Sequence, residues 1–390
     1  MTMPIKNKTV NIGILVPQSN FIPHLTRDIP DALQLGLTDN SEQYCVHLIH
    51  CGYNAEKQIL ENKLQNLIME KRIDIILCPL NSHLIEALKP TCAINQVTLI
   101  INTMGEDPTP INSMDGSTFI NSFHHWHTCW LSGYVATQQA SKKADTTNVA
   151  TMHCIHDGGY GASLALAVGV ESAEGEIVHT AITHREAREQ DASADIQEVV
   201  ANKPDTIIAN YSSKEALSFL KTYRKTSHDT RLFALPYLVD EQILDELGDD
   251  ALGVQSLSQW RKDSAAHQQF AGDFFAMTGH DVNPYVLMAY ESGKLINAAL
   301  QTLQTYSYAG INQALAHASF AGPRGEVSFN ADDTQLLRPY HLREVSRNED
   351  GSLYNKVIED VTPPQLSYEH YRAAQNGGDK QGWLNPYLIA

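Results

Sequence analysis

The segment Arg72-Ile73-Asp74-Ile75-Ile76-Leu77-Cys78-Pro79-Leu80-Asn81-Ser82-His83 contains the local pattern on which the predicted fold depends. Its apolar run at 73–77 is typical of a strand buried in a parallel sheet. Asn81 and Ser82 are good helix N-cap residues, and the residues after them predict a helix that ends before Pro90. A polar turn between strand and helix presents backbone N–H groups that can bind a carboxylate. Alternatively, Asn81 or Ser82 only caps its own helix.

The same strand–turn–helix pattern recurs along the chain. Further strands are predicted at 10–16, 44–49, 97–101, 119–123, 148–155, 176–180, 205–209, 232–235, 340–345 and 356–358. Helices are predicted at 29–37, after a cap at Asn54, and at 125–140, 162–173, 196–201, 214–223 and 265–303, the last with a break at 279–284. Strands that alternate with helices of this length predict parallel, helix-covered sheets with right-handed crossovers. Two successive series with similar polar exits predict two lobes and a cleft between their carboxyl edges.

Length and charge limit the possible functions. A chain of 390 residues is long enough for two cores, because single cores stop growing at roughly 250–300 residues. The formal net charge of −17 argues against nucleic acid or an anionic membrane surface as the main partner. No apolar run approaches the roughly 18 residues that a membrane-spanning helix needs, so no membrane span is expected.

The N-terminal segment does not have the pattern of a secretory leader. The first eight residues are polar, and the apolar run after them reaches Pro17 without a small-residue cleavage site. The expected location is therefore cytoplasmic if Met1 is the native start, and periplasmic if a signal peptide has been removed. The six cysteines lack CxxC spacing, which predicts neither a zinc site nor a redox pair and favours a reducing compartment.

No catalytic or metal-binding set can be assembled from the residues. In the segment 124–127, only His124 and His127 would share a helix face, and no third ligand is spaced with them. His153 and His156 are an odd number of residues apart, so on a strand they would point to opposite faces. His156 and Asp157 are neighbours at a predicted turn, where an acid–base pair seldom forms. The chain has no GxxxxGK[ST] or GxSxG motif, so we predict no catalytic residue, no metal and no cofactor.

Four segments carry motifs that occur together, in this order, in one protein family. They are Ile12-Gly13-Ile14-Leu15-Val16-Pro17, the strand and turn from Ile73 to Ser82, Asp157-Gly158-Gly159-Tyr160-Gly161, and Phe320-Ala321-Gly322-Pro323-Arg324-Gly325-Glu326-Val327-Ser328-Phe329-Asn330. These segments resemble the type I periplasmic binding proteins, in particular the leucine/isoleucine/valine- and amide-binding branch. The last segment is similar to the pattern FxGxxGxVxFD and is the most specific of the four. The resemblance extends from about Lys8 to Asp360.

The resemblance implies two Rossmann-like lobes with parallel, helix-covered sheets, joined by a three-crossover hinge and closing on a small molecule. Lobe one would comprise residues 9–122 and 258–328, lobe two 123–257 and 329–360, and 361–390 would form a C-terminal extension of unknown structure. By the same resemblance, ligand groups come from Ser19, Asn81, Ser82, Asn102 and Thr103 in lobe one and from Asp157, Tyr160, Tyr211, Ser212 and Tyr237 in lobe two. The asparagines of lobe one, with Ser82 and Thr103, would hold a carboxylate or amide that Tyr160 covers.

Two positions depart from the family pattern. Members that bind α-amino acids usually supply an acid from the loop after the strand at 232–235. Here that loop begins Pro236-Tyr237-Leu238-Val239, and Asp240 and Glu241 come only afterwards, which argues against a standard aliphatic amino acid. Cys78 lies before its turn, so the family's common first-lobe disulfide to Cys51 is not predicted.

The expected function is that of a non-enzymatic binding protein. It would capture a small polar organic ligand, such as an amino acid, an amide or a related carboxylate, for an ABC importer, with the transporter permease as its partner. The alternative is a cytoplasmic sensor of the same fold that passes ligand occupancy to a regulatory partner protein. An enzyme on this scaffold is disfavoured, because no nucleophile–base pair can be assembled.

Overall fold

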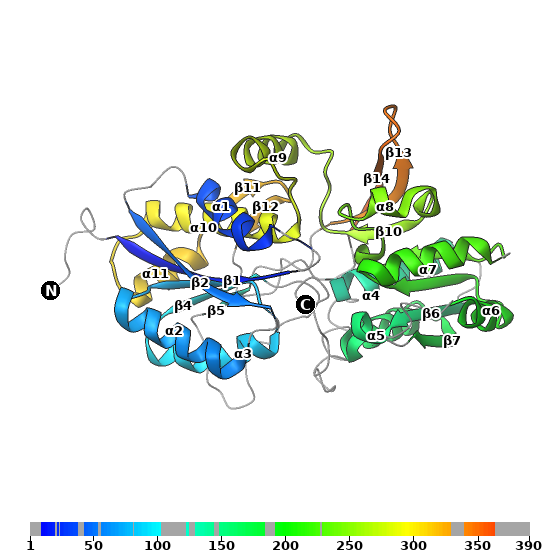
Figure 1. Ribbon diagram of the computed structural model, residues 1–390, viewed down its shortest axis with the longest axis horizontal. Coiled ribbons are helices and arrows are strands. Elements are labelled where there is room, and N and C mark those ends of the chain that lie inside the picture. The colour runs from blue at the N-terminus through cyan, green and yellow to red at the C-terminus, as the bar shows by residue number, and fades with distance from the viewer. Residues whose placement is uncertain are drawn as a thin grey trace. The chain divides into compact units, whose positions relative to one another are not determined.

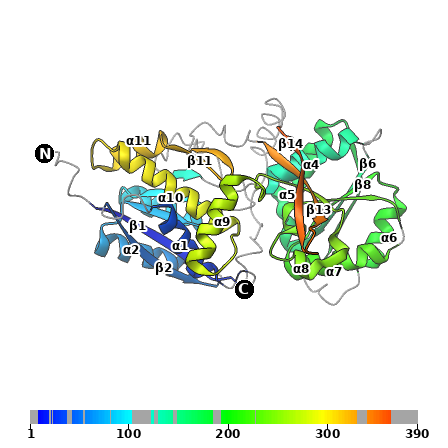
Figure 2. The ribbon, with the colours of Figure 1, turned by 90° about the horizontal axis from the view of Figure 1, so that it is seen from above.

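The computed structural model describes residues 9–19, 22, 24–37, 43–53, 56–80, 82–102, 122–124, 129–143, 148–183, 192–226, 228–328 and 339–362 (Figures 1 and 2). These residues divide into two compact units. Unit 1 is formed by the described parts of Met1–His127 and Lys262–Gln335, and unit 2 by those of Thr128–Arg261 and Leu336–Pro386. Each unit is an α/β structure, as predicted. Among the described helices, none is both long and apolar enough to cross a membrane.

Unit 1 contains a fully parallel five-stranded sheet with the order β2-β1-β3-β4-β5. Its strands are β1 (Val10–Pro17), β2 (Tyr44–Gly52), β3 (Ile75–Cys78), β4 (Thr98–Ile101) and β5 (Ser122–His124). The helices are α1 (Leu25–Gly36), α2 (Lys57–Lys71), α3 (Ser82–Ile94), α9 (Ala265–Thr278), α10 (Pro284–Thr302) and α11 (Tyr308–Ala316), and β11 (Ser319–Gly322) and β12 (Gly325–Ser328) form a hairpin. Figure 1 shows α2 and α3 on one side of the sheet and α1 and α10 on the other.

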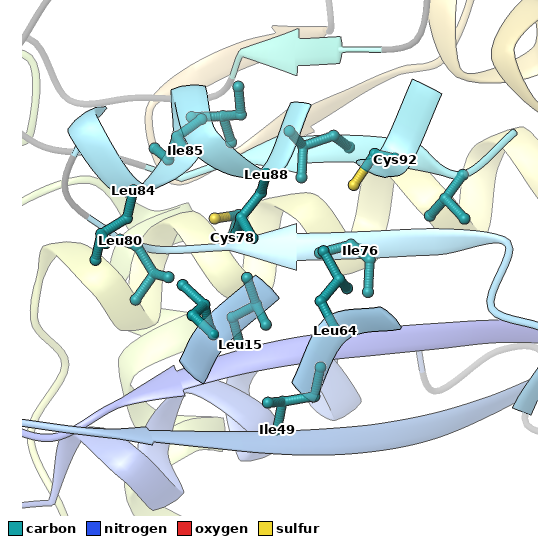
Figure 3. Packing of buried hydrophobic residues seen from close by; sticks show 14 of the residues in the cluster. Leu15, Ile49, Leu64, Ile76, Cys78, Leu80, Leu84, Ile85, Leu88 and Cys92 are labelled. Carbon is teal, nitrogen blue, oxygen red and sulfur yellow. The ribbon is translucent and has the colours of Figure 1, made fainter. Parts of the chain in front are cut away.

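The core between the sheet and the pair α2–α3 explains why β3 is so apolar. Leu64 of α2 and Leu88 of α3 are fully buried against Ile76 of β3 (Figure 3). The predicted stripe on α2 is confirmed at Leu60, Leu64 and Ile68, while Leu67 is only partly buried. Burying each such side chain contributes about 1.5–3 kcal/mol, so this layer fixes β3 in the middle of the sheet.

On the opposite side of the sheet, α1 and α10 cross at two glycines. A Cβ atom on Gly36 would lie 2.8 Å from the Cα of Gly293, and a Cβ on Gly293 would lie 2.5 Å from the carbonyl oxygen of Leu33. Any larger residue at either position would force the helices apart. The close crossing places the middle of α10 beside β4, and this brings Ser292 to the end of that strand.

Unit 2 contains a seven-stranded mixed sheet with the order β14-β13-β10-β9-β8-β6-β7. Five strands run parallel, namely β6 (Asn148–Cys154), β7 (Glu176–Thr183), β8 (Thr206–Asn210), β9 (Arg231–Ala234) and β10 (Gln255–Ser258). Antiparallel β13 (Tyr340–Arg347) and β14 (Leu353–Val361) extend the sheet beside β10. The helices are α4 (Cys129–Lys143), α5 (Ile155–Ser172), α6 (Ser193–Ala201), α7 (Ser213–Lys225) and α8 (Leu244–Leu247), with 3-10 turns η4 (Pro236–Val239) and η5 (Gly248–Ala251). Figure 2 shows α4 and α5 on one side of this sheet and α7 on the other.

Three local predictions were wrong. Helix α3 continues through Pro90 to Ile94, because the burial of Leu88 and Cys92 outweighs the hydrogen bond that proline removes. Helix α2 begins at Lys57 with Glu56 as its N-cap, so Asn54 does not cap it. The segment from His156 to Gly161, predicted to be a polar turn, belongs to α5, which begins directly after β6. The elements β10, α8 and α11 were not predicted.

Candidate functional site

In open α/β sheets, ligands bind outside the carboxyl ends of the parallel strands. The main sheet of each unit has such an edge. The edge of unit 1 follows β1, β3 and β4, and the edge of unit 2 follows β6, β8, β9 and β10. Of the ten residues that the sequence predicted as ligand groups, eight lie in the described backbone, each within six residues of the end of one of these strands.

At the edge of unit 1, the structure places Ser19 and Asn102. Ser19 is 5% exposed, and its Oγ accepts a hydrogen bond of 3.0 Å from the backbone N of Ile22, which shapes the turn after β1. Asn102 follows β4, and its backbone N donates to the carbonyl of Cys78 on β3 at 3.1 Å. Its side-chain Oδ1 accepts a 3.1 Å hydrogen bond from Ser292 Oγ on α10. That bond orients the amide and occupies one of the two acceptor sites of Oδ1, while the NH₂ group can donate.

The remaining candidates of unit 1 are only partly described. Ser82 is the first residue of α3, directly at the carboxyl end of β3, and its side chain lies outside the described residues. Asn81 and Thr103 also lie outside them. A helix N-terminus at this position presents unpaired N–H groups, as an anion-binding turn requires.

At the edge of unit 2, three predicted residues come from two neighbouring strands. Tyr211 and Ser212 follow β8, and Tyr237 lies in η4 directly after β9. All three are at most 3% exposed. The ring of Tyr211 stacks on Phe219 of α7 at a centroid distance of 4.3 Å. Ser212 is the N-cap residue of α7 but makes no side-chain cap hydrogen bond.

The other two candidates of unit 2, Asp157 and Tyr160, belong to the first turns of α5. Their side chains lie outside the described residues. Because α5 starts one residue after β6 ends, both are within two turns of the carboxyl edge. The ligand set as a whole stays a prediction.

Sequence reasoning missed a buried charged network beside this edge. Arg343 of β13 donates from Nη1 to Glu241 Oε1 at 2.9 Å, and Asn355 of β14 donates from Nδ2 to the same oxygen at 3.0 Å. Asp240 is engaged as well, since its Oδ1 accepts a 2.8 Å bond from the backbone N of Gln242. Asp240 and Glu241, the first acids after η4, therefore both accept hydrogen bonds from other groups of unit 2. No local pattern indicates the pair, because its members are about a hundred residues apart.

A buried histidine also lies at this edge. His153, the last residue but one of β6, is 2% exposed, and burial lowers its pKa to about 4. The side chain is therefore neutral at physiological pH. No sequence pattern selects this histidine, because an isolated histidine within an apolar strand is common in protein cores.

The described residues contain no group of three or more side chains suited to hold a metal ion. Of the histidines considered above, His124 is the last residue of β5, whereas His127 and the side chain of His156 lie outside the described residues. The described cysteines Cys45, Cys51, Cys78, Cys92 and Cys154 carry free thiols. Burial raises the pKa of Cys51 and of Cys92 to about 12, so these thiols are poor nucleophiles and poor metal ligands.

The sequence matches the periplasmic binding protein family over residues 9–351, which is most of the chain. The chain belongs to this family. Its resemblance to the leucine/isoleucine/valine-binding branch is confirmed by part of the Leu/Ile/Val-binding protein homolog 6 of Brucella suis biovar 1 (strain 1330), which is 29% identical over 159 residues. That stretch spans 38% of this chain and 40% of the relative.

Solved structures show the same fold. An ABC transporter substrate-binding protein from Sphaerobacter thermophilus is 20% identical and matches with a TM-score of 0.78 over 91% of this chain and 98% of its own. A solute-binding protein of an ABC transporter from Rhodopseudomonas palustris BisB5, solved with 3,4-dihydroxybenzoic acid, is 18% identical, with a TM-score of 0.72 over 91% and 97%. These similarities confirm the type I periplasmic binding fold with two lobes.

Proposed function

We propose that this periplasmic binding protein captures a small polar organic ligand for an ABC importer. The observation that carries the proposal is the family match over residues 9–351, combined with a polar carboxyl edge on each of the two sheets. The related proteins whose names state a role are substrate- or solute-binding proteins of ABC transporters. The partner would be the transporter permease, and the chain would have no catalytic role.

In this proposal, unit 1 holds the acidic or carbonyl end of the ligand. The donors would be the hydroxyls of Ser19, Ser82 and Thr103, the amides of Asn81 and Asn102, and the backbone N–H groups at the start of α3. The Ser292 bond supports a donor role for Asn102, because it orients the side-chain amide through the carbonyl oxygen. Unit 2 would supply Asp157, Tyr160, Tyr211, Ser212 and Tyr237, and the two units would close on the ligand by hinge motion.

The charge pattern after β9 favours a carboxylate or amide over an α-amino acid. An ammonium group removed from water needs a carboxylate partner. Glu241 is held by Arg343 and Asn355, and Asp240 is held by its own turn. Asp240 and Glu241 therefore both already accept hydrogen bonds within unit 2, and an ammonium would compete with these contacts. The compounds named for the relatives, leucine, isoleucine, valine and a hydroxybenzoic acid, span both possibilities.

Native mass spectrometry of gently purified protein tests the proposal directly. We expect an added mass that corresponds to a small carboxylate or amide. Isothermal titration calorimetry should then detect binding of at least one member of a panel comprising leucine, acetamide, benzoate, 4-hydroxybenzoate and 3,4-dihydroxybenzoate. Binding should also raise the melting temperature, because a ligand stabilises the state to which it binds. No added mass together with no heat from any panel member would contradict the proposal.

Two variants separate ligand residues from structural ones. Tyr237→Phe removes one hydroxyl at the edge of unit 2 and should lower the affinity for the panel compound that binds. Tyr306→Phe is a matched control at the opposite, amino end of the unit 1 sheet, because the Tyr306 hydroxyl donates to Asp74 Oδ2 at 2.6 Å beside the start of β3. This control should lower stability and leave affinity unchanged.

A further inference from the structure

His153 occupies an unusual position for a fully buried histidine. It lies one residue before the end of β6, where it pairs with Ile182 of β7 and Asn210 of β8. Its backbone carbonyl accepts a hydrogen bond of 3.2 Å from Thr183 Oγ1, so the main chain is fixed. Its side-chain Nδ1 is buried and has no hydrogen-bond partner among the described residues. Buried polar atoms are nearly always hydrogen-bonded, so this nitrogen indicates a missing partner.

The surroundings of His153 are polar on one side and apolar on the other. Residues paired in a parallel ladder point to the same face, so the side chain of Asn210 lies beside His153, about 4.8 Å away along the sheet. Leu235 continues the neighbouring strand, since its N donates to the Ala209 carbonyl at 3.0 Å. A Cβ atom on Gly133 of α4 would lie 3.4 Å from Leu235 and 3.2 Å from Leu166 of α5. Helices α4 and α5 therefore cover this face with apolar groups.

The charge state of the site determines which partner fits. Burial lowers the pKa of His153 to about 4, so the imidazole is neutral and has one donor and one acceptor nitrogen. Asn210 beside it is also uncharged. A carboxylate or an ammonium placed here would meet no opposite charge on these two side chains, and burying such an ion is costly. A group that both donates and accepts hydrogen bonds, such as a hydroxyl or a carboxamide, matches a neutral imidazole.

We propose that His153 is a ligand-contacting residue, which binds an uncharged hydroxyl or carboxamide group of the captured molecule at the carboxyl end of β6. The inference rests on the proposed function and deepens it, because it names the second polar group that the ligand carries in addition to its acidic or carbonyl end. One residue separates His153 from the start of α5, so a ligand seated at the carboxyl edge is within reach of the imidazole.

A pair of probes that differ by one hydroxyl tests the inference. Wild-type protein should bind 4-hydroxybenzoate about tenfold more tightly than benzoate in calorimetry, since one buried hydrogen bond is worth about that ratio. In His153→Leu, the ratio should fall to about one. The melting temperature without probe should not decrease at neutral pH, because an apolar side chain replaces a polar group that lacks its partner. The ratio of affinities is insensitive to a small loss of folded protein.

Thr206→Val is the matched control. Thr206 begins β8 at the opposite, amino end of the strand, is 1% exposed, and its Oγ1 likewise lacks a hydrogen-bond partner among the described residues. Removing this hydroxyl should leave the affinity ratio unchanged. A ratio that falls equally in both variants would overturn the inference, because the effect would then not be specific to the carboxyl edge.

Other outcomes are equally decisive. A lower melting temperature in His153→Leu with an unchanged ratio would show that the histidine anchors a structural water, and would overturn the inference. Wild-type protein that binds leucine or acetamide but neither benzoate probe, with affinity unaffected by His153→Leu, would also overturn it while the proposed function stands. Wild-type protein that binds no panel compound and carries no added mass would overturn the proposed function itself.

Discussion

Among the described residues, each unit contains a buried arginine–glutamate pair, and the two pairs differ in how deeply they are buried. In unit 1, Arg324 of the β11–β12 turn donates through Nε and Nη2 to Glu291 of α10, at 3.1 and 2.5 Å, with side chains only 4% and 0% exposed. In unit 2, Arg343 holds Glu241, which is 11% exposed and shares its oxygen with Asn355. The same chemical pair fastens a hairpin to a helix in unit 1 and holds a loop beside the carboxyl edge of the sheet in unit 2, with different energetic consequences.

Breaking the pair of unit 1 should have the largest effect. Arg324→Met leaves Glu291 buried without its guanidinium, and removing one partner of a buried ion pair typically costs about 3–5 kcal/mol. We expect the free energy of unfolding of unit 1, measured by urea denaturation and by hydrogen exchange of α10 amides, to fall by that amount. The double variant Arg324→Met with Glu291→Leu should recover much of the loss, because no uncompensated charge remains.

The equivalent change in unit 2 should lower the free energy of unfolding by less. Arg343→Met leaves Glu241 partly solvated and still bonded to Asn355, so the expected loss is about 1.5–3 kcal/mol, typical of a hydrogen bond to a charged group. Equal losses in Arg324→Met and Arg343→Met would contradict the interpretation that burial sets the difference. Because the proposed function places this loop beside the ligand, the released Glu241 should also increase the affinity for leucine relative to benzoate.

The two units should also respond differently to acid. In unit 2, burial lowers the pKa of His153 from 6.5 to about 4, so the unfolded state binds more protons than the folded state between these pH values. Stability therefore falls as the pH decreases from 6.5 to 4, by about 3 kcal/mol from this residue alone. His341 contributes in the same direction, since burial lowers its pKa despite the nearby Asp360, with Arg261 and Arg343 adding to the lowering.

Unit 1 contains a group with the opposite sign. Burial raises the pKa of Asp28 above 3.8, although His280 Nδ1 lies 2.8 Å from its Oδ1 and opposes the rise. Its folded state binds more protons than its unfolded state just above pH 3.8, so this group adds stability at low pH and loses it as the pH rises. Calorimetric melts between pH 7 and 4 should show the transition of unit 2 falling faster. His153→Leu should remove about 3 kcal/mol of that fall, and an unchanged pH dependence would refute the assignment.

Most of the fold was predictable because its signals are local. The strand predicted at 73–77 is observed as β3, shifted to Ile75–Cys78, and the stripe Leu60, Leu64 and Ile68 is confirmed, since the pattern of apolar residues determines which face is buried. Features that depend on distant partners were not predictable. Pro90 stays within α3 because of packing in the core, and the antiparallel strands β13 and β14 join a sheet whose other strands end about eighty residues earlier.

The candidate site was predictable only in part, for the same reason. The turns after β1, β4, β8 and β9 carry polar residues that the sequence shows directly, and the structure places Ser19, Asn102, Tyr211, Ser212 and Tyr237 at the two carboxyl edges. The bond between Asn102 and Ser292 spans 190 residues, and the pair Arg343–Glu241 spans 102. Pairings over such separations have no periodic signal. These pairings orient the amide of Asn102 and neutralise the carboxylate of Glu241.

The smallest predicted effect compares two serines at helix N-caps, one in each unit. In unit 1, Ser264 caps α9, and its Oγ accepts a hydrogen bond of 3.2 Å from the backbone N of His267. In unit 2, Ser212 occupies the same position on α7 without a side-chain cap bond.

Replacing a capping serine with alanine typically costs about 1 kcal/mol, so Ser264→Ala should lower the free energy of unfolding by that amount. Ser212→Ala loses no cap bond, and as a proposed ligand residue it should weaken binding of the panel compound instead. Calorimetry combined with urea denaturation on both variants separates the two roles. A cap-sized stability loss in Ser212→Ala with unchanged affinity would show that the serine at the edge of unit 2 is structural, and would remove it from the ligand set.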